Sequence, residues 1–336
     1  MKVLVNGLGN IGTTLLELLI QYQSVLGIES IYALKNQPMP WHKEELKELQ
    51  DRGVIVCSRN HSDFVEIERV LDQVEYVFDC TSNGGGVSNK AWYESMPNLI
   101  GACAQGSEKS FGTSFMTGIN EDVISQSKFA HIVSCNTHSL ASLMHTFSGF
   151  DLTNIKEADF VVVRRSEDIG NHQRLVSANV VARHLNSDIG THHSIDVKDL
   201  FETIDVDLPV TSSDVTTPSQ LMHGVRFNIS LKDGISDNHV QFIEQNGFVA
   251  TSIKFDSNVI FERGRRYGFQ GRIFSHAVII ANNLIVTPNS VKGWAFIPQE
   301  GNTLLSTIHA FLLQTKHLES KKAMHQLTHD LLKSIW

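Results

Sequence analysis

The chain of 336 residues has no run of five or more lysines and arginines, and its apolar runs are far shorter than the roughly 18 residues of a membrane helix. Without a basic cluster, and with a formal net charge of −8, it is poorly suited to nucleic acid or anionic membrane surfaces. Hydrophobic residues are 41% and charged residues 19%, which is typical of a globular protein and not of a disordered chain. We therefore expect about two globular domains, with neither nucleic acid nor a membrane as partner.

Cysteine is scarce, and its four copies form neither a CxxC pair nor the spacing of a disulfide framework. We expect free thiols and a cytoplasmic location. No signal-peptide pattern is visible either, because the apolar start of the chain leads straight into a glycine-rich turn at residues 7–12.

The first third of the chain alternates short apolar runs with helical periodicity. Strands are predicted at residues 2–6, 28–34, 54–57 and 76–80. Helices are predicted after the glycine-rich turn, at residues 43–52, and at 63–73, where Asp63 and Glu66 have capping-box spacing. This alternation predicts an α/β fold with a doubly wound parallel sheet of the Rossmann type.

From about residue 156 the pattern changes to longer β-rich runs separated by irregular stretches. The runs are residues 158–163, 225–231, 248–255 and 272–281. They predict a mixed or antiparallel sheet in a second domain. Residues 302–336 return to a helical pattern.

The turn GLGNIG has the GxGxxG spacing, with Gly7, Gly9 and Gly12 between a predicted strand and a predicted helix. Such glycines let the backbone approach the pyrophosphate of a dinucleotide, and a plain turn between core elements is the alternative. NAD sites usually carry Asp or Glu about 20 residues further on, where this chain has Lys35 and Asn36. These two side chains suit the 2′-phosphate of NADP, although Lys35 could equally be a solvated turn residue.

Cys135 follows the predicted strand at residues 130–133 and precedes a helical pattern. The N-terminus of a helix stabilises a thiolate, so this position suits a nucleophile. Cys57 and Cys103 lie in apolar runs and Cys80 ends a strand, so these three are interpreted as small buried hydrophobes.

Other polar groups each allow two interpretations. The tandem Arg164–Arg165 could bind phosphate or be solvated, and His223 could act in catalysis or be a core histidine. The pair His192–His193 could bind substrate, lie on the surface, or form half of a metal site with His184. Since metal ligands on a helix are usually three or four residues apart, we expect no metal.

Several of these motifs occur together in a consistent order along nearly the whole chain. They are NGLGNIG at residues 6–12, NGGG at 83–86, SCNT at 134–137, VRR at 163–165, HH at 192–193 with Asp196, LMH at 221–223, FNISLKD at 227–233 and QE at 299–300. In this combination the chain resembles the archaeal, or type II, glyceraldehyde-3-phosphate dehydrogenases.

The resemblance implies a Rossmann domain at residues 1–134 and 301–336, and a mixed α/β catalytic domain with a largely antiparallel sheet at 135–300. It implies that Cys135 attacks a phosphorylated aldehyde, that His223 is the general base and polarises the oxygen, and that NADP or NAD takes the hydride. Inorganic phosphate then releases an acyl phosphate from the thioester. A homotetramer is also implied.

The motifs and the resemblance together assign the site residues to two groups, and the resemblance is the ground for Asn10, Ile11 and Gln299 in the first. The cofactor group is Gly7, Gly9, Asn10, Ile11, Gly12, Lys35, Asn36, Arg165 and Gln299. The substrate group is Ser134, Asn136, Thr137, Arg164, His192 and His193.

The chain departs from the family pattern around the expected phosphate and cofactor contacts. His138 stands where Thr is common, Val225 replaces a second histidine, and Thr13 follows the turn where basic residues are usual. Two other functions therefore stay open. One is a related cysteine-dependent semialdehyde dehydrogenase or acyl-phosphate reductase, and the other is a dinucleotide-binding sensor without turnover.

Overall fold

The computed structural model describes residues 1–106, 108–166, 181–183, 187–219, 221–234 and 239–332. Contacts divide the chain into two compact units, Met1–Ile132 with Ser306–Met324 and Val133–Leu305 with His325–Trp336. Each unit contains one sheet of eight strands. Within the described part of the chain, no helix is both long enough and apolar enough to cross a membrane.

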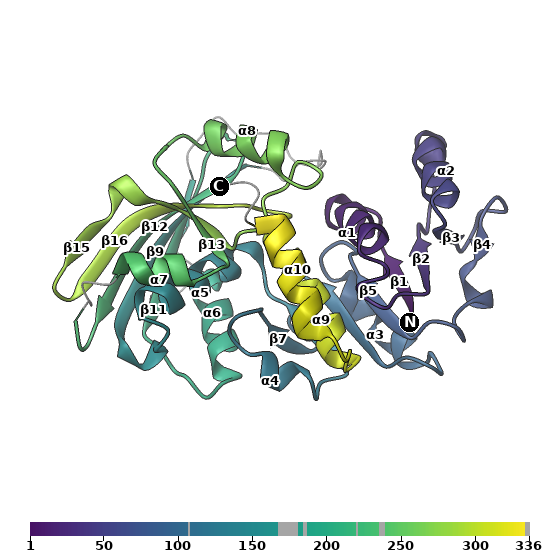
Figure 1. The fold of residues 1–336 in the computed structure, drawn as a ribbon, viewed down its shortest axis with the longest axis horizontal. Helices are drawn as coiled ribbons and strands as arrows, with labels where there is room; N and C mark the ends of the chain where they lie inside the picture. Colours follow the sequence, from purple (N-terminus) through teal and green to yellow (C-terminus); the bar gives the residue numbers. More distant parts are fainter. Residues whose placement is uncertain (107, 167–180, 184–186, 220, 235–238, 333–336) are drawn as a thin grey trace. The chain divides into compact units, whose positions relative to one another are not determined.

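The first unit is built on a fully parallel sheet with the order β4-β3-β2-β1-β5-β6-β8-β7 (Figure 1). The strands are β1 (Lys2–Asn6), β2 (Ser30–Leu34), β3 (Ile55–Ser58), β4 (Val65–Glu66), β5 (Tyr76–Asp79), β6 (Gly101–Gln105), β7 (Thr113–Phe115) and β8 (Phe129–Ile132). The helices are α1 (Asn10–Gln21), α2 (Lys43–Asp51), α3 (Gly85–Glu94), α4 (Glu121–Ile124) and, from Ser306 on, α9 (Leu304–Gln314). The predicted doubly wound sheet is confirmed.

The two faces of β5 are covered by different helices because successive strand residues point to opposite sides. Tyr76 and Phe78 contact Phe311 of α9, with ring centroids 4.9 and 5.6 Å apart. On the other face, Asp79 accepts a hydrogen bond from the hydroxyl of Tyr93 on α3, which in turn accepts one from the Asn6 side chain at 2.6 Å. This buried network ties the end of β5 to the end of β1, where the strand order of the sheet reverses and open α/β sheets bind ligands.

The second unit contains a mixed sheet with the order β10-β11-β9-β12-β16-β14-β13, and β15 pairs with β16. The strands are β9 (Ile155–Arg164), β10 (Val181–Arg183), β11 (Val210–Thr216), β12 (His223–Leu231), β13 (Val249–Ser252), β14 (Ala277–Ile280), β15 (Ile285–Thr287) and β16 (Ser290–Ile297). The helices are α5 (Cys135–Phe147), α6 (His192–Glu202), α7 (His239–Gln245), α8 (Ser257–Tyr267) and, from His325 on, α10 (Ser320–Leu332). Most neighbours are antiparallel, and β9–β11 and β13–β14 are parallel, as the mixed-sheet prediction requires.

Helix α5 packs on the face of this sheet that carries the odd-numbered residues of β12. Phe227 of β12 stacks on Phe147 of α5, with ring centroids 5.4 Å apart. Since the side-chain period of a strand is two, His223 lies on the same face as Phe227. Figure 1 shows α8 on the opposite side of the sheet from α5 and α6. The fold thus directs His223 to the face of the sheet that α5 covers.

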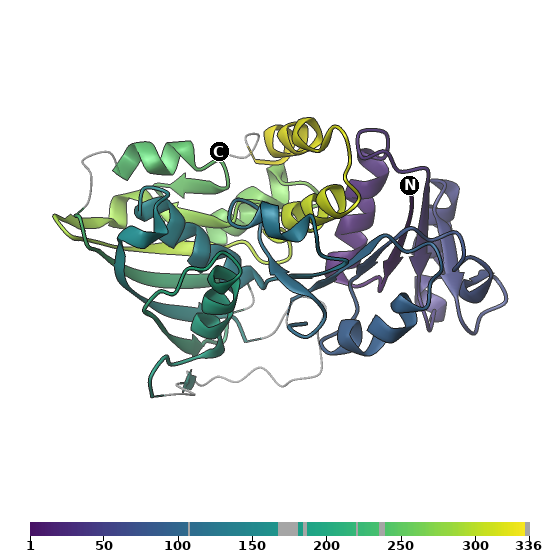
Figure 2. The same cartoon turned by 90° about the horizontal axis from the view of Figure 1, so that it is seen from below.

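One prediction of local structure is wrong. Residues 63–73 form β4 and a short 3₁₀ turn, Ile67–Arg69, instead of a helix. Val65 pairs with Cys57 at the edge of the sheet and Ile67 is fully buried in the core, so tertiary pairing overrides the capping-box spacing. The helical pattern predicted from residue 302 on is confirmed by two helices, α9 and α10, which are drawn in yellow in Figure 2 and are separated near Lys316 with φ +52°.

Candidate functional site

Cys135 is the first residue of α5, as the sequence predicted. Ser134 caps the helix, because its hydroxyl oxygen accepts a hydrogen bond from the backbone N–H of Thr137 at 3.3 Å. The Asn302 side chain donates to the carbonyl oxygen of Cys135 at 3.0 Å and so ties this turn to the loop after β16. The thiol is partly exposed at the positive end of a capped helix, which favours the thiolate.

The other three cysteines lie in surroundings that oppose ionisation. Burial raises the pKa of the Cys57 and Cys103 thiols to about 12. Burial also raises the pKa of Cys80 well above its usual value, and nearby Cys103 and Asp79 add to this effect. These three thiols are protonated at neutral pH, which leaves Cys135 as the cysteine placed for nucleophilic chemistry.

His223 is buried at the start of β12, and the N–H of Arg165 and the Gln299 side chain fix its ring. The backbone N–H of Arg165 donates to Nδ1 at 3.0 Å. The side-chain nitrogen of Gln299 lies 2.6 Å from Nε2, and Oε1 of Gln299 accepts from the backbone N–H of His223 at 3.2 Å. Burial lowers the pKa of His223 well below its usual value. The positive charges of Arg165 and Arg164, and then His193, lower this pKa further. A backbone N–H can only donate, so Nδ1 of the neutral ring accepts from Arg165.

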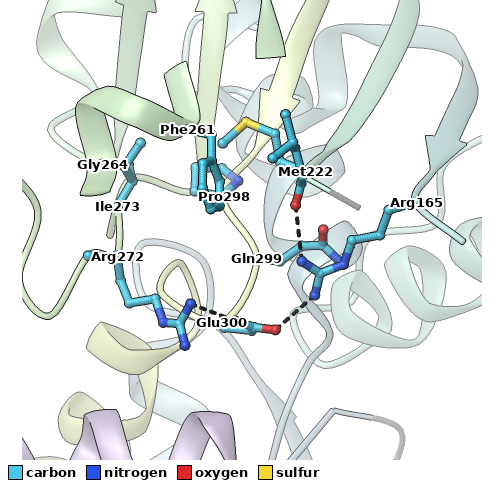
Figure 3. Close-up of a pocket in the computed structure, with 11 residues that line it drawn as sticks. Arg165, Met222, Phe261, Gly264, Arg272, Ile273, Pro298, Gln299 and Glu300 are labelled. Atoms are coloured by element: carbon cyan, nitrogen blue, oxygen red, sulfur yellow. Dashed lines mark hydrogen bonds and ion pairs between the residues drawn. The ribbon is translucent and has the colours of Figure 1, made fainter. Parts of the chain in front are cut away.

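Two arginines share one carboxylate beside His223 (Figure 3). Glu300 accepts from Arg165 at 2.8 Å through Oε1 and pairs with Arg272 at 2.9 Å through Oε2. Arg165 also donates to the carbonyl oxygen of Leu221 at 3.1 Å. The Arg165 and Glu300 side chains are 3% and 9% exposed, so this ion pair lies in a low-dielectric environment. The pair holds Arg165, whose backbone N–H donates to His223. These side chains line a small cavity of about 30 Å³.

A second polar cluster lies where β9, β11 and α6 meet. Arg164 pairs with Asp214 at 3.7 Å, and Nε2 of His193 lies 3.9 Å from the same carboxylate. The Asn136 side chain approaches Nδ1 of His193 at 3.5 Å. Burial lowers the pKa of His193 well below its usual value, with His192 and Arg164 as lesser causes. The ring is therefore neutral at pH 7.

The predicted substrate residues Asn136, Arg164 and His193 thus come together. Asn136 adjoins Cys135, and Arg164 adjoins Arg165, whose backbone N–H donates to His223. His192 stacks near His193, with ring centroids 4.0 Å apart. Thr137 is buried and serves the Ser134 cap.

His192, His193 and Asp214 place possible metal-ligand atoms within 4.8 Å of one another. The Arg164 guanidinium already pairs with the Asp214 carboxylate at 3.7 Å and so competes with a cation for this ligand. The predicted alternative partner His184 lies outside the described residues.

In the first unit, the glycine-rich turn has the three features that a pyrophosphate site needs. Gly7 has φ +98°, and a Cβ on it would lie 2.7 Å from the Cys80 carbonyl oxygen. A Cβ on Gly12 would lie 1.9 Å from the Gly7 carbonyl oxygen, so only glycine allows this close packing. A Cβ on Gly9 would meet nothing within 4 Å, so the space before the turn is open to a ligand. The turn therefore fits a dinucleotide.

The remaining predicted cofactor residues lie around this turn or in the second unit. Asn10 and Ile11 open α1, Lys35 donates to the Leu8 carbonyl oxygen at 3.4 Å, and Asn36 is exposed beyond β2. Arg165 and Gln299 lie against His223 in the second unit, as described above.

Sequence reasoning missed Asp214, Arg272 and Asn302, and it quoted Glu300 only as part of a motif. Asp214 had one detectable signal, since it alternates with Val210 and Ser212 on the buried face of β11. Nothing local marks Arg272 or Asn302. The His138 ring is fully buried, and its Nδ1 lies 3.0 Å from the Ser134 carbonyl oxygen.

No family model matches the chain. Over 297 residues it is 24% identical to a glyceraldehyde-3-phosphate dehydrogenase of Saccharolobus islandicus, covering 86% of this chain and 82% of that protein. Enzymes of the same name from Methanobacterium bryantii and Methanobacterium formicicum are 30% and 31% identical over 177 and 178 residues. These two matches span 52% of this chain and about half the length of the relatives, 49% of each. The chain is similar to archaeal glyceraldehyde-3-phosphate dehydrogenases.

Proposed function

We propose that the protein is a phosphorylating aldehyde dehydrogenase of the glyceraldehyde-3-phosphate dehydrogenase type that uses NADP or NAD. The observation that carries the proposal is Cys135 at the capped N-terminus of α5, with the other three thiols held protonated. The names of the archaeal relatives support the substrate class. The fit of the glycine-rich turn to a pyrophosphate supports the cofactor.

In the proposed reaction, the Cys135 thiolate forms a carbon–sulfur bond to the aldehyde carbon, and the carbonyl oxygen becomes an alkoxide. In this proposal His223, which burial keeps neutral, takes the proton of the thiol or hydroxyl and polarises that oxygen.

A bound nicotinamide dinucleotide supplies the acceptor for the hydride, and the loss of hydride leaves a thioester on Cys135. Inorganic phosphate then attacks the thioester carbon, the carbon–sulfur bond breaks, and the thiolate leaves. The residues for the pyrophosphate are the turn glycines with Asn10 and Ile11, whose N–H groups begin α1.

The test is a direct assay. Purified full-length protein with glyceraldehyde 3-phosphate, phosphate and NADP or NAD is expected to produce reduced cofactor, measured by absorbance, in a phosphate-dependent manner. Absence of reduced cofactor with either dinucleotide would contradict the proposal. Oxidation of a semialdehyde without oxidation of glyceraldehyde 3-phosphate would favour the cysteine-dependent semialdehyde dehydrogenase or acyl-phosphate reductase. Dinucleotide binding without any turnover would select the sensor.

Lys35→Asp is expected to shift cofactor preference from NADP towards NAD. A cation beside a 2′-phosphate makes a charge-assisted contact, so its replacement by a carboxylate should change the ratio of kcat/KM for the two cofactors by about 10- to 100-fold. The matched control is Lys322→Asp on α10, an exposed lysine of the same unit. An unchanged ratio in the Lys35 variant would refute this role.

A further inference from the structure

The cluster around Asp214 holds buried polar atoms of both kinds, donor and acceptor. Within the described part of the chain, four of its side-chain atoms have no hydrogen-bond partner. They are Asn136 Oδ1, Arg164 Nε, His193 Nε2 and Asp214 Oδ1. Buried polar atoms are nearly always paired, so such a group indicates the place of a ligand that both donates and accepts.

The charges of this cluster cancel. Arg164 contributes one positive charge and pairs with the carboxylate of Asp214 at 3.7 Å. His193 is neutral, because burial lowers its pKa well below its usual value. The side chains of His193 and Asp214 are 1% and 2% exposed, so solvent screens little of the carboxylate's charge. A phosphate group there would meet a buried carboxylate and no net positive charge.

The spacing suits a hydroxyl group. His193 Nε2 and Asp214 Oδ2 are 3.9 Å apart, too far for a direct hydrogen bond. The amide nitrogen of Asn136 can only donate to Nδ1 of His193, so the proton of the neutral ring is on Nε2. An oxygen about 2.8 Å from both atoms accepts from Nε2 and donates its own hydrogen to the carboxylate. Phosphate dianion has no hydrogen to donate to that carboxylate.

We propose that Asp214, with His193, makes this cluster a subsite for an uncharged hydroxyl-bearing part of the aldehyde and thereby sets substrate specificity. The proposal deepens the proposed function and rests on it. It changes the expected role of the cluster, since Arg164 was a candidate phosphate ligand and the resemblance implied that His193 contacts the phosphorylated substrate.

The first test measures binding and does not require turnover. Assigned nuclear magnetic resonance signals of the His193 ring are followed in the full-length protein while glycerol, sulfate or zinc chloride is added. Glycerol is expected to shift these signals and sulfate to leave them unchanged. Asp214→Asn, which removes the charge and keeps the shape, should weaken the glycerol response about 10-fold and allow sulfate to bind.

The second test measures specificity. The ratio of kcat/KM for glyceraldehyde over propanal, which lacks hydroxyl groups, should fall about 10- to 100-fold in Asp214→Asn. The matched control is Asp159→Asn, an exposed aspartate on the neighbouring strand β9 that accepts from Thr211. This variant should keep the wild-type ratio and the wild-type His193 response.

Three results would overturn the proposal: a response of the wild type to sulfate and not to glycerol, a stoichiometric zinc response, or no response to glycerol. The binding test on the wild type stands even where Asp214→Asn fails to fold. If glycerol shifts His193 as expected while no aldehyde is oxidised, the proposed function fails and the hydroxyl subsite holds.

Discussion

Replacing Cys135 by serine abolishes aldehyde oxidation, with kcat expected to fall by about 10³-fold or more. A serine hydroxyl at the same helix N-terminus is not ionised at neutral pH and cannot form the thioester that the reaction passes through. The change removes one sulfur atom and leaves the Ser134 cap in place, so dinucleotide affinity should be nearly unchanged. Steady-state kinetics and calorimetric titration of NADP measure the two effects separately.

The control for this variant comes from the other thiols. Because burial raises the pKa of Cys103 to about 12, iodoacetamide at pH 7 should label Cys135 and spare Cys103 in the folded protein. Cys103→Ala is therefore expected to keep its activity. Turnover in Cys135→Ser comparable to wild type would rule out Cys135 as the nucleophile.

Gly12→Ala should destabilise the first unit by on the order of 3 kcal/mol and eliminate dinucleotide binding. The added Cβ would lie 1.9 Å from the Gly7 carbonyl oxygen and 3.2 Å from the Cys80 Cβ. The carbonyl belongs to the backbone of the turn, so relief of the clash requires α1 to move away from β1. Urea unfolding measures the loss of stability.

Two further glycines serve as controls. Gly247 has open space around its Cβ position, so Gly247→Ala should leave both stability and binding close to wild type. Gly9 is equally open, yet it stands where the pyrophosphate would approach. Gly9→Ala should therefore fold normally and bind NADP more weakly. Normal stability in Gly12→Ala would show that the turn is not packed as described.

The parallel sheet was predictable because its signals are local. Lys2–Asn6 is a strand with exactly the predicted bounds, and the glycines of the following turn have roles that a single short motif encodes. The helix start at Cys135 was predictable for the same reason, since an apolar strand ends just before it and a periodic apolar pattern follows. Where one segment carries its own start, stop and periodicity, the sequence is sufficient.

The predictions failed where distant segments decide the outcome. Asp63 and Glu66 have the spacing of a helix cap, yet the pairing of Val65 with Cys57 makes the segment an edge strand. Glu300 lies 135 residues from Arg165, and no local pattern indicates that they pair. Asp214 shows the same limit, because its partners Arg164 and His193 come from another strand and a helix.

Trapping the intermediate tests the central claim most directly. Wild-type protein is mixed with glyceraldehyde 3-phosphate and NADP or NAD without inorganic phosphate, quenched in acid and mapped by peptide mass spectrometry. An acyl group is expected on Cys135, and it should disappear when phosphate is added before the quench. Reduced cofactor formed with no acyl group on Cys135, or with an acyl group on a different residue, would contradict that claim.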